Sequence, residues 1–63
     1  MYSALLNSIR YYEVLIVENS AYLGEVLREK DWKTACEVRE IVDDLSRQKE
    51  SLIRIAERVV RLN

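Results

Sequence analysis

The sequence predicts an all-α protein: an antiparallel helical hairpin that dimerises into a four-helix bundle. Apolar residues recur in alternating steps of three and four along both halves of the chain, which is the spacing of a heptad seam. The two seams are out of phase with each other, and the 63 residues include no proline and one glycine. We therefore expect residues 1–63 to form a single helical-hairpin domain, with helices at about 3–28 and 32–62 and a turn at about 29–31.

The first helix is predicted by a seam that only Asn19 interrupts. Gly24 lies in the same span and costs up to about 1 kcal/mol relative to alanine, so it is either a tolerated surface glycine or a point of close helix approach. The seam consists of Tyr2, Leu5, Ile9, Tyr12, Ile16, Asn19, Leu23 and Val26.

The second helix has a seam that only Lys49 interrupts. Val26 and Ala35 are nine residues apart, about 900° of helical rotation, so one continuous helix would place the two seams on opposite sides. A hairpin places them face to face, and Asp31 can cap the second helix by accepting a hydrogen bond from the amide near Thr34. The seam consists of Ala35, Val38, Val42, Leu45, Lys49, Leu52, Ala56 and Val59.

Apolar residues on both sides of each seam indicate a homodimer. Left exposed, they would exceed the few hundred Å² of apolar patch usual for monomers, and a core of this size rarely supplies more than ~3–5 kcal/mol. Pairing about a two-fold axis buries them. The flanking residues are Leu6, Leu15, Tyr22, Leu27, Trp32, Ile41, Ile53, Ile55, Val60 and Leu62. The expected dimer core is Leu5, Ile9, Tyr12, Ile16, Asn19, Leu23, Val38, Leu45, Leu52 and Val59.

The polar seam residues allow two interpretations. Asn19, Tyr12 and Lys49 form polar layers near the dimer centre that fix its register, or Lys49 extends to solvent and Asn19 lies at a loosely packed edge.

The chain resembles the ROP-type plasmid RNA-binding regulators, which are dimers of helical hairpins. The resemblance covers the whole chain and rests on its length, its mid-chain turn and the small–large seam of Ala35, Val38, Val42, Leu45, Leu52 and Ala56. The chain resembles more closely the small helical-hairpin proteins of the Sulfolobus spindle-shaped viruses, a ROP-like family described as adaptors. This second resemblance implies an archaeal virus protein that acts in the cytoplasm of the host cell.

The RNA-contacting surface of the ROP type is not matched. On an ungapped overlay it falls at Ser3, Arg10, Val14, Glu18 and Glu25, where that family has lysine, asparagine, phenylalanine, glutamine and lysine. The two glutamates would repel phosphates instead of releasing their counterions, so we do not expect RNA binding at this surface.

The composition argues against catalysis. Without histidine the chain lacks the Glu-x-x-His pairs of di-iron bundles and any histidine-based nucleophile relay, and zinc lacks its usual ligands. Asp43 and Asp44 show no ligand-loop pattern, and Cys36 has no strong activating neighbour in the sequence. We expect no enzyme, no metal and no cofactor.

The outer side of the first helix carries the candidate functional site. Tyr11, Val14, Val17 and Ala21 follow steps of three and four about half a turn from the seam, where a hairpin should present charged residues. Arg10 and Glu18 form the rim. We interpret this surface as a docking site for an unidentified protein, in a non-enzymatic adaptor that a two-fold axis makes bivalent. Local helix propensity or a contact in a higher oligomer would also explain it.

Two other functions stay open. Arg47, Arg54 and Arg61 lie seven apart and could bind RNA or DNA, but an acidic residue precedes each by four positions, which is typical of a salt-bridged solvent face. The net charge of −1 also makes nucleic acid an unlikely partner. A small export chaperone is the other alternative, because such hairpins carry a tryptophan just after the turn, as at Trp32.

We expect no membrane partner and a cytoplasmic location. The longest apolar run, residues 14–17, is far shorter than the ~20 residues that span a bilayer, and no secretory signal is recognisable.

Overall fold

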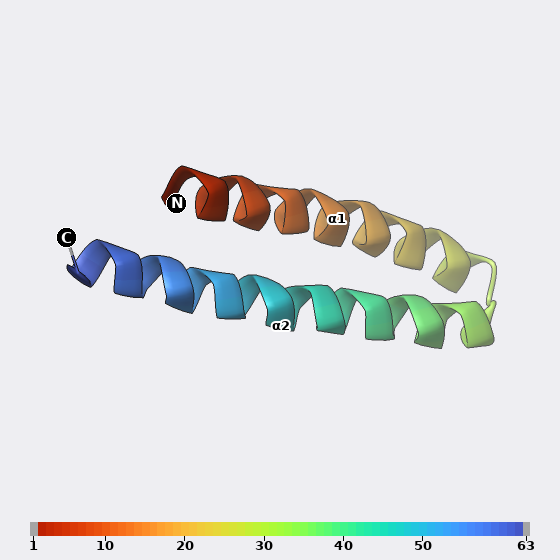
Figure 1. The fold of residues 1–63 in the computed structure, drawn as a ribbon. Coiled ribbons are helices and arrows are strands. Elements are labelled where there is room, and N and C mark those ends of the chain that lie inside the picture. The colour runs from red at the N-terminus through yellow and green to blue at the C-terminus, as the bar shows by residue number, and fades with distance from the viewer. Residues whose placement is uncertain (1, 63) are drawn as a thin grey trace.

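The computed structural model describes residues 2–62, which form two long helices joined by a tight turn (Figure 1). α1 comprises Tyr2–Arg28 and α2 comprises Trp32–Leu62. The helices lie side by side and antiparallel, so that the start of α1 and the end of α2 share one end of the molecule (Figure 1). The Cα trace measures 50 × 14 × 11 Å. The prediction of an all-helical hairpin is confirmed, and residues 2–62 contain no strand.

The end of α1 is a Schellman motif without glycine. Lys30 adopts a φ of 59°, the left-handed conformation that glycine usually provides at this position. The Lys30 amide donates to the Leu27 carbonyl at 3.1 Å, and the Asp31 amide donates to the Val26 carbonyl at 3.0 Å. These two bonds satisfy carbonyl groups that the helix end would otherwise leave unpaired.

Asp31 also begins α2. Its Oδ1 accepts a hydrogen bond from the Thr34 amide at 3.2 Å, and its carbonyl accepts from the Ala35 amide at 2.9 Å. Hydrogen bonds from the Thr34 hydroxyl and, secondly, from the Thr34 amide hold the pKa of the Asp31 carboxyl below its usual range. The predicted cap is therefore present, and Asp31 belongs to the ends of both helices.

The core is a narrow line of mostly small side chains between the two helices. Ile9, Val26, Ala35, Val38 and Ala56 are buried. The other residues of the two predicted seams are half-buried, except Tyr2, which is exposed at the open end of the hairpin. The helices thus meet along the predicted seams. None of the side chains in residues 2–62 is completely enclosed, because each of two helices can cover only one stripe of the other.

The polar seam residues find partners near the edge of this contact. The side-chain amide of Asn19 donates to the Leu15 carbonyl of its own helix at 2.8 Å. The Lys49 ammonium lies 3.6 Å from the Glu13 carboxylate, so Lys49 extends from α2 to the side of α1. A Cβ added at Gly24 would meet no atom within 4 Å, which makes Gly24 a surface glycine and not a point of close helix approach.

Candidate functional site

The predicted docking residues form an exposed apolar row on α1. Tyr11, Val14 and Val17 are 63%, 52% and 67% exposed, and Ala21 is also exposed. These residues lie about half a turn from the buried seam, so they point away from α2. A two-helix fold needs none of them for its own packing.

Charged residues border this row. Arg10, Val14, Val17 and Glu18 line one open hollow on α1, together with Glu13. The structure therefore brings together four of the six predicted residues and adds a second carboxylate beside them. The Arg10 guanidinium and the carboxylates of Glu13 and Glu18 surround the apolar Val14 and Val17, so the hollow combines an apolar centre with charges of both signs. Such a surface can hold apolar side chains and orient polar groups around them.

The exposed ring of Tyr11 packs against the ring of Tyr12. The Tyr11 and Tyr12 rings have centroids 6.4 Å apart and an interplanar angle of 65°, the edge-to-face arrangement that aromatic pairs favour. Tyr12 is half-buried in the seam, so it links the exposed ring to the helix contact. Ala21 extends the row toward the turn but does not line the hollow.

The ten residues predicted for a dimer core all lie on the seam of the single hairpin. Ile9 and Val38 are buried and the other eight are half-buried. They already contact the facing helix, and the half-buried ones keep part of their surface exposed along the sides of the hairpin.

The arginines of α2 differ from the expected pattern of pairs. The Arg47 guanidinium lies 3.1 Å from the Asp44 carboxylate, while its Nε donates to the Asp43 carbonyl at 3.5 Å. The expected pair with the Asp43 carboxylate is therefore replaced by a pair three residues back. The ion pairs within residues 2–62 do not join Arg54 or Arg61 to the acidic residue four positions before it. The arginine row of Arg47, Arg54 and Arg61 therefore has fewer ion pairs with acidic side chains than the spacing predicts.

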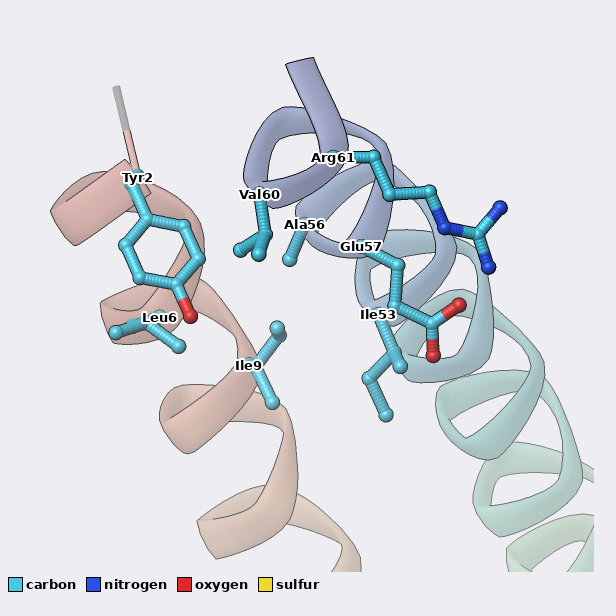
Figure 2. A pocket seen from close by; sticks show the side chains of 8 residues that line it. All are labelled: Tyr2, Leu6, Ile9, Ile53, Ala56, Glu57, Val60 and Arg61. Atoms are coloured by element: carbon cyan, nitrogen blue, oxygen red, sulfur yellow. The ribbon is translucent and has the colours of Figure 1, made fainter. Parts of the chain in front are cut away.

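Two further apolar hollows lie on one broad side of the hairpin. Side chains of both helices meet across the hollow at the open end, where Leu6 and Ile9 face Ile53 and Val60 (Figure 2). Near the turn, Leu27 and Trp32 line the second hollow with Arg39. We call this side the hollowed face. Because the helices are antiparallel, it consists of the residues that directly follow every second seam residue, with Trp32 one heptad before Arg39: Leu6, Glu13, Ser20 and Leu27 of α1 and Trp32, Arg39, Ser46, Ile53 and Val60 of α2.

The hollows were not identified from the sequence. The seam pattern identifies Leu6, Ile53 and Val60 only as residues flanking a seam. A signal exists, because they follow Leu5, Leu52 and Val59, which occupy the same heptad position, and residues after that position share one side of an antiparallel pair.

Other kinds of site are not seen in the described part of the chain. Residues 2–62 contain no group of three or more side chains that could hold a metal ion. Cys36 is an exposed free thiol at the edge of the hollow near the turn. Neither α1 nor α2 has an apolar stretch long enough to cross a lipid bilayer.

The chain matches no protein-family model, no curated protein and no solved structure. The resemblance to ROP-type and spindle-shaped virus proteins stays a prediction from the sequence pattern.

Proposed function

We propose that this chain is a non-enzymatic homodimeric adaptor that binds another protein through the outer surface of α1. The exposed row of Tyr11, Val14 and Val17 is the observation that carries the proposal. Single apolar side chains are ordinary on a protein surface, whereas a contiguous row is typical of a contact site. Packing against α2 does not explain this row, since it lies on the other side of α1.

The surface area of the hairpin supports the homodimer. The chain exposes 5075 Å², whereas a compact monomer of its mass, 7.5 kDa, exposes about 4,200 Å². A core as narrow as this one rarely stabilises a chain of this length without help. Two hairpins that pair into a four-helix bundle bury apolar surface beside the seams and supply that help.

Dimerisation gives the adaptor two equivalent binding surfaces. A two-fold axis repeats the α1 row on each copy, so one dimer bridges two copies of its partner and gains affinity from the linkage. Arg10 and Glu18 at the rim favour a partner with an apolar centre and polar surroundings. The resemblance to the spindle-shaped virus proteins extends the proposal to a viral protein that acts in the cytoplasm of its host.

The proposal is tested by affinity capture from the cells that make the protein, with and without nuclease. The test variant is Val14→Glu with Val17→Glu, which introduces two carboxylates into the apolar row. The matched control is Arg54→Glu on α2, which lowers the net charge by the same amount at another exposed site. Sedimentation of each purified variant shows whether the homodimer is kept.

We expect the wild-type chain and Arg54→Glu to retain a protein partner after nuclease treatment, and the double variant to lose it while staying dimeric. Loss of the dimer in the double variant would show that Val14 and Val17 are core residues. Capture that disappears with nuclease in the wild type would contradict the adaptor.

The arginine row favours nucleic-acid binding as a second candidate. Arg54 and Arg61 are exposed, and within residues 2–62 no ion pair joins them to Glu50 or Glu57, so their guanidinium groups can contact phosphates. This candidate predicts that the chain retains nucleic acid from the lysate. That retention should be lost on nuclease treatment, fall steeply with salt concentration and be weakened by Arg54→Glu. The same variants thus separate the two functions.

A further inference from the structure

The two broad sides of the hairpin differ in charge. The side opposite the hollowed face is built from residues that directly precede every second seam residue, namely Ile9, Ile16 and Leu23 in α1 and Ala35, Val42, Lys49 and Ala56 in α2, together with Leu62, which lies one heptad after Ile55. We call it the charge-free face; it consists of Ser8, Leu15 and Tyr22 of α1 and Thr34, Ile41, Gln48, Ile55 and Leu62 of α2. Because the helices are antiparallel and meet along their seams, these positions share one side.

The charge-free face lacks charged residues along its whole length, although 33% of the chain is charged. The seam residues next to it are also uncharged: Leu5, Tyr12, Asn19, Val26, Val38, Leu45, Leu52 and Val59. The hollowed face, by contrast, carries Glu13 and Arg39, and the Lys49 ammonium reaches Glu13 there. Depletion of charge, more than apolar content, distinguishes the core of an interface from ordinary surface.

The charge-free face also has the exposure and the area that an interface needs. Tyr22, Ile41 and Ile55 are 49%, 47% and 39% exposed, so large apolar side chains remain uncovered along it. The broad side of the Cα trace is 50 Å by 14 Å, on the order of 700 Å², which is close to the ~800 Å² that each partner buries in a standard interface.

We infer that a second copy of this chain docks on the charge-free face. The inference rests on the proposed homodimer and adds which side of the hairpin forms its interface. A two-fold axis brings the same face of both copies together, so no charged side chain is buried in either. Both two-fold arrangements, turn beside turn or turn beside open end, make this contact. The hollowed face, with Glu13, Arg39 and Lys49, then stays exposed to solvent. This dimer covers the apolar flank on one side of the seams and leaves the other, with Trp32 and Val60, uncovered, whereas the sequence pattern predicts that both are buried.

The chain offers a matched pair of serines for a gain-of-affinity test. Ser8 on the charge-free face and Ser20 on the hollowed face are both exposed on α1. Sedimentation equilibrium of the full chain over a range of concentrations measures the dimer Kd. Ser8→Leu adds apolar surface to the interface and should lower the Kd by about threefold or more. Ser20→Leu should leave it unchanged.

A second pair tests for loss of affinity. Ile41→Lys places a charge on the charge-free face, and Val60→Lys places one on the hollowed face; both residues are exposed on α2. We expect Ile41→Lys to raise the Kd by about tenfold or more and Val60→Lys to change it by less than about twofold. Circular dichroism at the same concentrations shows whether each variant keeps its helix content. If Ile41→Lys unfolds, Ser8→Leu and Ser20→Leu provide the test of the face in its place.

The outcomes separate this inference from the homodimer itself. A wild-type chain that is monomeric at all concentrations would contradict the homodimer, and the inference with it. A dimeric wild type in which Ser20→Leu and Val60→Lys shift the Kd, or in which both members of each pair act equally, would overturn the choice of face and leave the homodimer standing.

Discussion

Replacing Lys30 by glycine should stabilise the hairpin. Lys30 has a φ of 59°, and in this region the Cβ of an L-residue crowds the following carbonyl oxygen. The conformation is kept because the amides of Lys30 and Asp31 both donate to the end of α1. Glycine adopts the same backbone without the crowding, and both hydrogen bonds stay.

The expected gain is the difference of two terms. The left-handed conformation costs a non-glycine residue roughly 1–2 kcal/mol. Glycine also gives the unfolded chain more conformational freedom, which stabilises the unfolded state by about 0.4–1 kcal/mol. The free energy of unfolding should therefore rise by about 0.5–1 kcal/mol per chain. For a domain of this size that corresponds to a Tm increase of several degrees.

Urea unfolding followed by far-ultraviolet circular dichroism measures this gain, at one protein concentration because association contributes to stability. Lys30→Ala is the first control, since alanine removes the same charge and side chain but keeps the Cβ. Lys33→Gly is the second, because Lys33 has helical backbone in α2, so glycine there frees the unfolded chain without relieving any crowding and should lower stability.

The reasoning requires Lys30→Gly to be the most stable of the three variants and more stable than the wild type. A Lys30→Gly chain no more stable than Lys30→Ala would refute it, since the two differ only in the Cβ. In that case the left-handed backbone would not determine the stability of the turn.

Three further predictions concern other parts of the hairpin. Gly24→Ala should raise the free energy of unfolding by about 0.5–1 kcal/mol in urea titrations, since a Cβ there meets no atom within 4 Å. Val38→Ala should lower the free energy of unfolding by roughly 1.5 kcal/mol, which is the transfer free energy of two buried methyl groups. Asp31 should make stability depend on pH. Its folded-state pKa is lowered by the hydrogen bonds from Thr34, so the stabilisation is complete above the unfolded pKa of about 3.9 and is lost as pH falls through the folded pKa. Thermal unfolding at a series of pH values should show this loss in the wild type and a weaker one in Asp31→Asn.

Hydrophobic spacing was sufficient to predict the hairpin. Residues such as Leu23, Val38 and Ala56 lie between the helices because each helix can bury only one stripe, and the stripe follows from the period. Tyr2 belongs to the same period but is exposed, since side chains at the open end have fewer neighbours to cover them.

The left-handed conformation that ends α1 could not be predicted in the same way, although the helix ends at Arg28 as the sequence predicts. A lysine in the left-handed conformation has no characteristic sequence pattern, and the usual glycine signal is absent at Lys30. The ion pair of Arg47 shows a similar limit. Asp43 and Asp44 are adjacent, and both lie within reach of an arginine three or four residues later, so the choice depends on rotamers.

The candidate site was predictable where it depends on one helix. The exposure of Tyr11, Val14 and Val17 follows from their phase relative to the seam. Glu13 joins their hollow while it lies beside Lys49 of α2, and a contact between helices is not encoded in local spacing. The hollowed face was missed for the same reason, since its hollows need side chains from both helices.

The double use of Asp31 restricts how the length of this chain can change. A residue inserted next to it separates the end of α1 from the start of α2, and a residue inserted within a helix rotates everything beyond it by about 100°. The packed contact can therefore grow or shrink only at the open end of the hairpin. There it keeps its pattern when each helix changes by one heptad. Functional length variants of this architecture should accordingly differ by about fourteen residues, divided equally between the two ends of the chain.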